Sequence, residues 1–289
     1  MTRINRLWKL IVVVVAAVAV MRGAGAALAG ANVPTAYTLY LSAPGAGTVA
    51  GIPYGDEDVL RYSPAANPQW AMHFDGSAAG LPAAADIDAY AFLYNASSFT
   101  SSHYMSFDRP VAVPGLGTVD DSDVVLYRTS LLGNTWSLYF DGSAYGLTTD
   151  AEDVDGLEIN GADGLLLSTT GGFNVPTVNS AYFKGADEDF LYWETAKNAF
   201  TYLGDGTNLG IAATNELFNL AISNNGAALT AYTLFSVQKP AAVNGVNAGA
   251  FDVLFEQSSI GSWEYGLLWD ASASGFPKVD AMDAVLDFD

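Results

Sequence analysis

The chain contains no cysteine and only two histidines, His73 and His103. The lack of cysteine excludes a scaffold stapled by disulfides, so stability must come from the burial of apolar side chains. Neither histidine belongs to an H-E-x-x-H motif, and the sequence has no G-x-S-x-G and no glycine-rich phosphate loop. It therefore offers no recognisable centre for a zinc protease, a serine hydrolase or a nucleotide-dependent enzyme, and we assign no catalytic residue.

Basic residues are also scarce, at 11 against 31 acidic ones. Four of the basic residues lie before position 32, so 7 basic and 31 acidic residues follow it, a formal net charge of −24. Such a surface repels nucleic acid and anionic lipid, and we expect neither as a partner. It attracts cations, although solubility alone explains the charge equally well.

Long apolar runs are absent except at the start of the chain, where residues 10–21 are uninterrupted. Twelve residues are fewer than the ~20 that a membrane-spanning helix needs. Arg3, Arg6 and Lys9 precede the run, and A-x-A patterns follow it, ending at Ala29 and Ala31. This order is typical of a secretory signal peptide. We therefore predict a signal peptide over 1–31, and an exported protein over 32–289 that is secreted or periplasmic and has no membrane span.

The remaining chain is dominated by an internal repeat of about 65 residues. An aromatic strand ending in Asp and small residues, as in WSLYFDGSAYGL, occurs four times, with its Asp at 75, 141, 205 and 270. A second recurrent segment consists of acidic residues followed by an apolar strand, as in DSDVVLY, and its Asp lies at 58, 123, 189 and 252. A Ser/Thr-rich strand and a short strand beginning with acids complete each unit. The recurrent Asp-Gly and Gly positions of the first landmark indicate turns, and its aromatic residues indicate core.

Four short β-strands per repeat are the content of one propeller blade. The sequence thus predicts an all-β, four-bladed β-propeller with four-stranded blades, formed by 32–289. The chain begins inside one repeat and stops just after the first strand of another, near residues 280–289, so we expect the terminal strands to pair and close the ring. A β-solenoid, and two β-sandwiches with a boundary near Asp150, are the alternatives.

The recurrent acids predict cation sites. Aspartate pairs precede three equivalent strands, and Ca²⁺ prefers six to eight oxygen ligands. These pairs are Asp56 with Asp58, Asp121 with Asp123, and Asp187 with Asp189. Capping of backbone amides in turns is the competing interpretation, and none of the pairs lies in a complete EF-hand loop.

A second group of acids starts the strands that we expect to line the axis. Asp88, Asp155 and Asp283 occupy corresponding places in three repeats, and Phe218 takes the fourth. Here the chain resembles the hemopexin-type four-bladed propellers, in which an Asp-Ala pair opens the innermost strand of each blade. Asp88-Ala89 and Asp283-Ala284 match that pair, and the resemblance implies ions at the axis. Hemopexin-type repeats are shorter, and a disulfide closes their ring. The FDGSxxGL and DEDxxxY motifs resemble repeats of exported bacterial proteins, a likeness that brings no activity with it.

Together these features favour a monomeric binding or structural surface module that holds Ca²⁺ or another cation and contacts an extracellular glycan or protein. A carbohydrate-active hydrolase is the alternative, because paired carboxylates abound. A small-ligand binder at the axial opening is a third option. Residues outside the repeat, such as His103, Arg109 and the loop 174–185, are where we expect a specific site.

Overall fold

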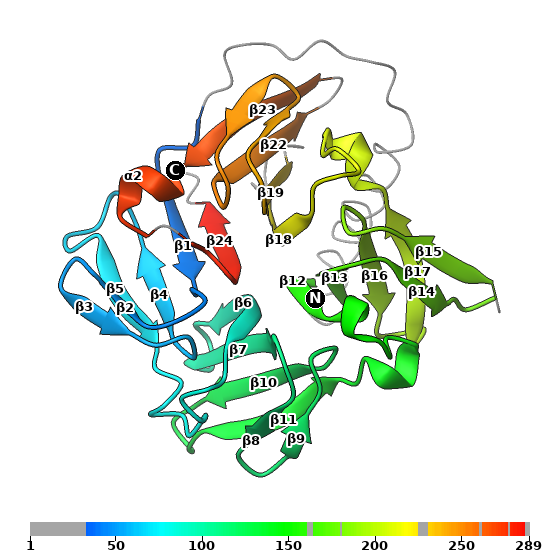
Figure 1. Ribbon diagram of the computed structural model, residues 1–289. Coiled ribbons are helices and arrows are strands. Elements are labelled where there is room, and N and C mark those ends of the chain that lie inside the picture. Colours follow the sequence, from blue (N-terminus) through cyan, green and yellow to red (C-terminus); the bar gives the residue numbers. More distant parts are fainter. Residues whose placement is uncertain are drawn as a thin grey trace.

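A computed structural model describes residues 33–160, 164–179, 181–224, 231–259, 262–276 and 278–286. Four antiparallel sheets of four strands each are arranged around a common axis, which makes the molecule a four-bladed β-propeller (Figure 1). The predicted fold class is confirmed. The predicted signal peptide, residues 1–31, lies outside the described residues.

Each blade is a meander whose first strand lies next to the axis. From the inside outward, blade 1 consists of β24 (Met282–Leu286), β1 (Tyr37–Leu41), β4 (Val59–Tyr62) and β5 (Trp70–Phe74). Blade 2 consists of β6 (Ile87–Asn95), β7 (Thr100–Phe107), β10 (Val124–Thr129) and β11 (Thr135–Phe140). Blade 3 consists of β12 (Val154–Asn160), β13 (Gly164–Thr169), β16 (Phe190–Glu194) and β17 (Ala199–Gly204). Blade 4 consists of β18 (Leu217–Asn224), β19 (Ala231–Val237), β22 (Val253–Ser259) and β23 (Ser262–Trp269).

The two ends of the described chain close the ring. Strand β24 pairs with β1 in antiparallel register, with Leu39 opposite Ala284 and Tyr37 opposite Leu286. Figure 1 shows these red and blue strands side by side in blade 1. The predicted closure is therefore confirmed, and it removes the two sheet edges that an open array would expose.

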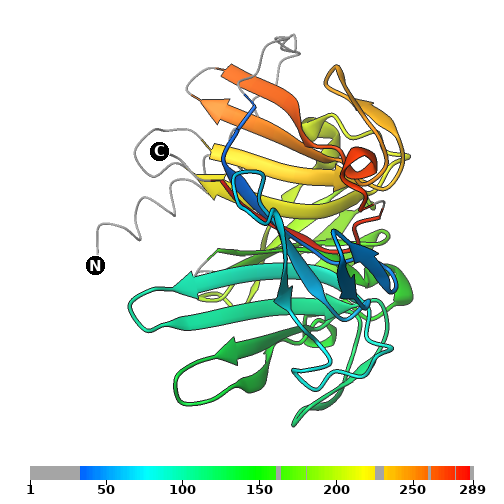
Figure 2. The same cartoon turned by 90° about the vertical axis from the view of Figure 1, so that its left-hand side faces the viewer.

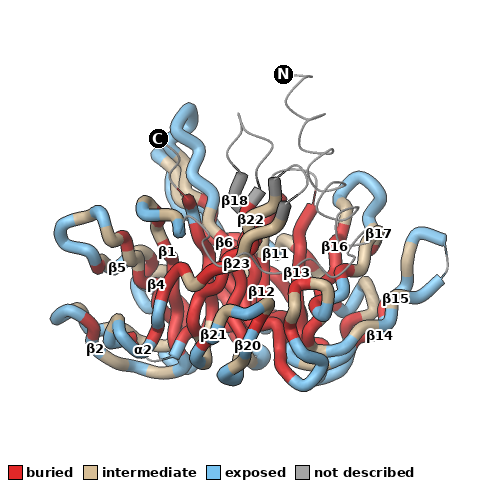
Figure 3. The backbone as a smooth tube through the Cα atoms, turned by 90° about the horizontal axis from the view of Figure 1, so that it is seen from above, coloured by how far each residue is buried: buried red, intermediate tan, exposed pale blue. Residues whose placement is uncertain are grey.

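Four two-stranded hairpins decorate the sheets, one between the second and third strands of each blade. They are β2–β3 (Gly47–Val49, Ile52–Tyr54), β8–β9 (Val111–Val113, Gly117–Val119), β14–β15 (Phe173–Pro176, Tyr182–Gly185) and β20–β21 (Ala241–Val243, Val246–Ala248). Short helical turns follow several outer strands: η1 (Ser143–Tyr145), η2 (Asp150–Glu152), η3 (Gly206–Leu209) and α2 (Ala271–Ser274). Labels β2, α2, β20 and β14 lie along the lower side of the molecule in Figure 3. We call this end of the ring the hairpin face and the opposite end the tip face.

The core lies between neighbouring blades, where rows of aliphatic and aromatic side chains interdigitate. Phe74, Phe140, Phe200 and Trp269 are all buried, as expected of the repeated aromatic strand. Burial is concentrated around the axis, whereas the outer loops and turns are largely exposed (Figure 3). The sequence of the segment 212–222 also fits a helix, but residues 217–222 lie in the strand β18, in line with the other repeats.

A recurrent aspartate ties each blade together from within. In blade 2, the N–H groups of Asp120 and Gly142 donate to the two carboxylate oxygens of Asp123, both at 3.0 Å. The corresponding pairs of N–H groups reach Asp58, Asp189 and Asp252 in the other blades. One carboxylate thus clamps the turn before the third strand to the loop after the fourth.

The aspartates of the first landmark form turns, as predicted. Asp141 accepts a bond from the N–H of Ala144, and Asp75 and Asp270 accept equivalent bonds. The glycine that follows each of these turns has a positive φ, with Gly146 at 97°. Such a φ favours glycine, which explains why this residue recurs in all four repeats.

Candidate functional site

The four innermost strands bring acidic residues together at the hairpin face. In blade 1 the residue that occupies the equivalent position differs from the one that the alignment of the sequence repeats predicts. Tyr90, Leu157 and Leu220 each pair with the residue before a serine that recurs in the second strand of each blade. In blade 1 that partner is Met282, opposite Leu41. The residue two places earlier is Asp88 in blade 2, Asp155 in blade 3 and Asp280 in blade 1.

Asp280, and not Asp283, is therefore the structural counterpart of Asp88 and Asp155. The sequence alignment was shifted by three residues because it matched Asp283-Ala284 to Asp88-Ala89. Another sequence pattern gives the correct alignment. Asp86-Ile87-Asp88 and Asp153-Val154-Asp155 both read acid–aliphatic–acid, and Lys278-Val279-Asp280 matches them except that a lysine replaces the first acid. The burial of Val279 agrees with this alignment, because its counterparts Ile87 and Val154 are also buried.

Six carboxyl groups from all four blades meet at this end of the axis. We call them the carboxyl cluster: Asp86, Asp88, Asp153, Asp155, Glu216 and Asp280. All are buried except Asp280, which is half-buried. Asp86, Asp153 and Glu216 precede the inner strands of blades 2, 3 and 4 at the same register, so the cluster forms an outer and an inner row.

Burial is the main cause of strongly perturbed acidity in the cluster. It raises the pKa of Asp153 to about 8, with repulsion from Asp121 and Asp108 adding to the effect. Burial and the neighbouring Asp86 raise the pKa of Asp280 to about 8. The pKa of Asp88 also lies well above its ordinary value, because of burial and repulsion from Asp280 and Asp153. Several of these groups therefore carry protons at neutral pH.

Two pairs of carboxyls from adjacent blades lie close enough to share a proton. Asp86 pairs with Asp280 across blades 2 and 1, and Asp155 pairs with Glu216 across blades 3 and 4. A hydrogen bond between two carboxyls requires a shared proton. Burial is again the largest cause of the raised pKa of Asp155, followed by the charge of Glu216.

The cluster also contains buried oxygen atoms that accept no hydrogen bond from an N–H or hydroxyl group of the described residues. They are Oδ1 of Asp86, Oδ1 of Asp153, Oδ2 of Asp155 and Oε1 of Glu216, and Oδ1 of Asn219 is a further such atom outside the cluster. Buried acceptors without a donor are costly, and they are satisfied by a proton or by a cation. Their chemistry suits a hard cation such as Ca²⁺. However, in the described ranges no three Asp, Glu or His side chains converge closely enough to hold one ion by themselves.

Asp283 lies deeper along the axis, with Glu158 as its counterpart in the opposite blade. The N–H of Phe92 donates to Asp283 at 2.8 Å, and the N–H of Ile222 donates to Glu158 at 3.2 Å. Burial raises the pKa of Asp283 to about 6, and burial together with the charge of Asp283 raises the pKa of Glu158. Sequence reasoning missed Glu158, because Ala91 and Ala221 occupy its place in the neighbouring blades.

The three predicted aspartate pairs do not join this cluster as units. Asp58, Asp123 and Asp189 clamp backbone amides, which occupies one lone pair on each of their oxygens. The main-chain oxygens of Asp56, Asp121 and Asp187 accept the N–H groups of Ile87, Val154 and Leu217, the first residues of the next blade's inner strand. These contacts agree with the interpretation that the aspartate pairs cap turns. Cation binding by the six residues of the three pairs stays a prediction.

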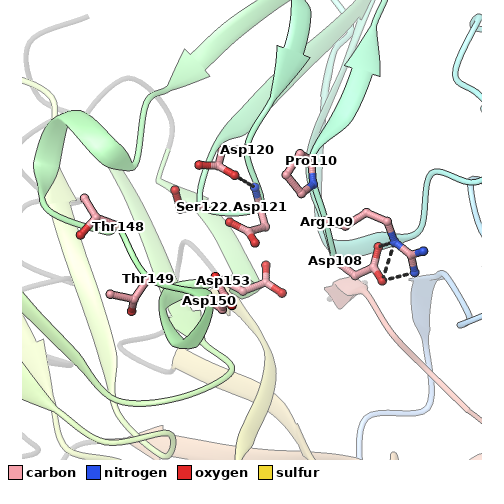
Figure 4. Close-up of a pocket in the computed structure, with 10 residues that line it drawn as sticks. All are labelled: Asp108, Arg109, Pro110, Asp120, Asp121, Ser122, Thr148, Thr149, Asp150 and Asp153. Carbon is pink, nitrogen blue, oxygen red and sulfur yellow. Dashed lines mark hydrogen bonds and ion pairs between the residues drawn. The ribbon is translucent and has the colours of Figure 1, made fainter.

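A pocket of about 420 Å³ opens beside the cluster, between blades 2 and 3. Asp108, Arg109, Asp121, Thr149 and Asp153 are among its lining residues (Figure 4). Arg109 forms an ion pair with Asp108 on the rim, so this residue outside the repeat lies next to the acids. A protonated Asp153 and further carboxylates thus share one solvent-filled space.

The two histidines meet away from this site, between blades 1 and 2. Their ring centroids are 5.3 Å apart, and Nδ1 of His103 is 2.7 Å from the hydroxyl of Tyr90. Burial lowers the pKa of His73 to about 3, with smaller effects of His103 and Arg61, and lowers the pKa of His103 to about 4. Both rings are neutral at physiological pH and pack as part of an aromatic cluster.

Comparison with known proteins adds little to this geometry. No protein-family model matches the chain, and no curated protein matches it. Among solved structures, an extracellular domain of a B. thetaiotaomicron protein is similar, with 10% sequence identity and a TM-score of 0.32. The match covers 83% of this chain and 34% of that one, so the chain spans about a third of the other's length. In the described part of the chain, no helix has the length and hydropathy needed to cross a bilayer.

Proposed function

We propose that the protein is an exported binding module that takes up a cation, with Ca²⁺ as the first candidate, at the carboxyl cluster. The observation that carries this proposal is the set of buried carboxyl oxygens that no N–H or hydroxyl group reaches, contributed by blades 2, 3 and 4 around the axis. Only oxygen ligands are present there, and they are the ligands that hard divalent cations prefer. The ring supplies the scaffold, and its exposed loops supply the surface for an extracellular glycan or protein.

Uptake of the cation is coupled to the loss of protons. The proton of Asp153, whose pKa is about 8, and the shared protons of the two carboxyl pairs, one of which includes Asp280, reduce the negative charge of the site at pH 7. A divalent cation lowers these pKa values and replaces the protons, as metals do at other carboxylate sites. The carboxyls then rearrange from pairs into a common ligand set, with water completing the coordination.

Calorimetric titration of the EDTA-treated protein with CaCl₂ and with MgCl₂ tests this proposal. Repeating it in two buffers of different ionisation enthalpy counts the protons released, and we expect about one or two per ion at pH 7. The change Asp280→Asn should weaken binding at least tenfold. Asp270→Asn is the matched control, because Asp270 is an exposed turn cap on the same face and asparagine can also cap.

Absence of heat, together with an unchanged melting temperature at millimolar CaCl₂, would overturn cation binding. Binding without proton release would place the ion on the general acidic surface and not at the cluster. An Asp280→Asn variant that binds as well as the unchanged protein would lead to the same conclusion.

The pocket between blades 2 and 3 supports a second candidate, a glycoside hydrolase. Asp153 is protonated at neutral pH and faces a pocket that also contains Asp108 and Asp121, which suits a general acid beside a carboxylate. The test is the release of reducing sugar from a panel of polysaccharides. Activity that is lost in Asp153→Asn and kept in Asp141→Asn would favour the hydrolase, and the absence of activity on the panel would leave the binding module.

A further inference from the structure

Blade 2 carries a second pocket at the tip face, far from the carboxyl cluster. Its volume is about 640 Å³, and its lining includes Leu93, Tyr94, Asn95, Thr100, Ser102 and Arg128. Along β6, Asp88 lies five residues before Leu93 and seven before Asn95, a distance of roughly 17–23 Å along an extended strand. In Figure 2 the turn that joins β6 to β7 projects at the left of the molecule.

The strand register explains how these residues form one surface. Ser102 of β7 lies opposite both Leu93 of β6 and Arg128 of β10, so the three form a row across the sheet. Asn95 and Thr100 pair in the next row toward the tip. Because side chains alternate along a strand, this row faces the same side as Tyr104 and Leu126, which pack into the core between blades 2 and 3. The pocket is the solvent-filled end of that interface.

Arg128 is the feature of this pocket that points to a ligand. Its side chain is exposed, and it donates a hydrogen bond to the hydroxyl of Tyr104. Arg109 and Lys197 are paired with carboxylates, whereas Arg128 forms no ion pair with an acid of the described chain. In a protein with such an excess of acidic groups, a guanidinium at a pocket that has no carboxylate partner among the described residues can receive an anionic group. Its planar fork suits a carboxylate, which it can bind through two parallel hydrogen bonds.

The other lining groups suit a sugar ring. Asn95, Thr100 and Ser102 offer an amide and hydroxyls, which can exchange hydrogen bonds with sugar hydroxyls. Leu93, 36% exposed, lies in the same row as Ser102 and Arg128, so its apolar side chain can pack against the C–H face of a sugar.

We propose that this pocket binds an acidic saccharide, with the carboxylate of one uronic-acid residue held by Arg128 and the sugar ring lying against Leu93. The large negative charge of the protein disfavours long polyanions, so short oligosaccharides or chain ends with few carboxylates are the expected ligands. The site is independent of the cation proposed at the hairpin face.

The experiment measures binding of short galacturonate and glucuronate oligosaccharides to the full chain by calorimetry, in EDTA and at low salt. The methyl esters of the same oligosaccharides keep the ring and remove the charge. We expect the esters to bind at least tenfold more weakly, and Arg128→Gln to cause a similar loss. Arg128→Lys should recover only part of the affinity, because an ammonium lacks the planar fork.

Arg109→Gln is the matched control, since it removes an exposed arginine from the other face, and it should leave saccharide binding unchanged. Asp280→Asn should also bind normally, which separates a failure of this proposal from a failure of cation binding. Equal affinity for acids and esters, unchanged binding by Arg128→Gln, or no binding of either acidic oligosaccharide would overturn the assignment.

Discussion

Replacement of Asp123 by alanine tests whether the recurrent aspartate is a clamp or a cation ligand. In the structure its two oxygens accept the N–H groups of Asp120 and Gly142, each at 3.0 Å. The bond from Gly142 is buried, and the bond from Asp120 is partly exposed. Alanine removes both acceptors and leaves one N–H buried without a partner, while water can reach the other.

The magnitude follows from these two bonds. An unsatisfied buried N–H costs about 1–3 kcal/mol, and the loss of a solvent-accessible bond costs about 1 kcal/mol. Asp123→Ala should therefore lower the free energy of unfolding by about 2–4 kcal/mol, a large share of the ~5–15 kcal/mol typical of a domain. Asp123→Asn should lower the free energy of unfolding by nearly as much, because its amide NH₂ group replaces one accepting oxygen and so faces a backbone N–H donor.

Urea denaturation followed by tryptophan fluorescence measures this difference, provided that the slope with denaturant is unchanged. Asp141→Asn is the control in the same blade, since the exposed turn cap keeps one acceptor, and its effect should stay within about 0.5 kcal/mol. The loss for Asp123→Ala should be the same in EDTA and in CaCl₂. A loss below about 1 kcal/mol, or one that appears only with CaCl₂, would refute the clamp.

Two further predictions concern pH and one concerns closure. Asp153 and Asp280 have folded-state pKa values of about 8 and unfolded values near 4, so they favour the folded state at low pH and this contribution is lost as pH rises toward 8. Between pH 6.5 and 7.5 stability should fall by on the order of 2 kcal/mol per pH unit, measured by urea denaturation across that range, and a rise would contradict the assignment. His73 and His103 have folded pKa values below their ordinary one, so their contribution is present above pH 6.5 and is lost as pH falls toward 4. Replacing both by glutamine should reduce the loss of stability below pH 6.5, which thermal denaturation at pH 5 and pH 7 would show; an unchanged difference between the two pH values would count against buried, neutral rings. Truncation of 282–289 removes β24 from blade 1 and should abolish cooperative unfolding, whereas a sharp transition in the truncated chain would show that closure is dispensable.

Much of the fold could be predicted because the local sequence of each repeat specifies its own strands and turns. Alternation of apolar and polar residues, with Asp-Gly turns at fixed intervals, specifies short antiparallel strands without reference to the rest of the chain. Four copies in the same order, with the first strand of one blade displaced to the C-terminus, favoured a closed ring. The pairing of Leu39 with Ala284 confirmed it.

The candidate site was only partly predictable, because its members are defined by register between strands. Asp88 and Asp155 were placed correctly as equivalents, but Asp283 was taken for Asp280, a shift of three residues that a short degenerate motif cannot resolve. The pairing of β24 with β1 resolves it, since hydrogen bonds allow one register while sequence similarity allows several.

The sequence by itself determined the elements, their number and their order, since these depend on local propensity and on a period repeated four times. The tertiary structure alone decided which acids meet, because the charges of Asp86 and Asp280, or of Asp155 and Glu216, come from different blades and are brought together only when the ring closes. It also decided which carboxylates are occupied by backbone amides and which keep buried oxygens without a donor. That distinction depends on three-dimensional burial, and it is the physical basis of the cation site that we propose at the hairpin face.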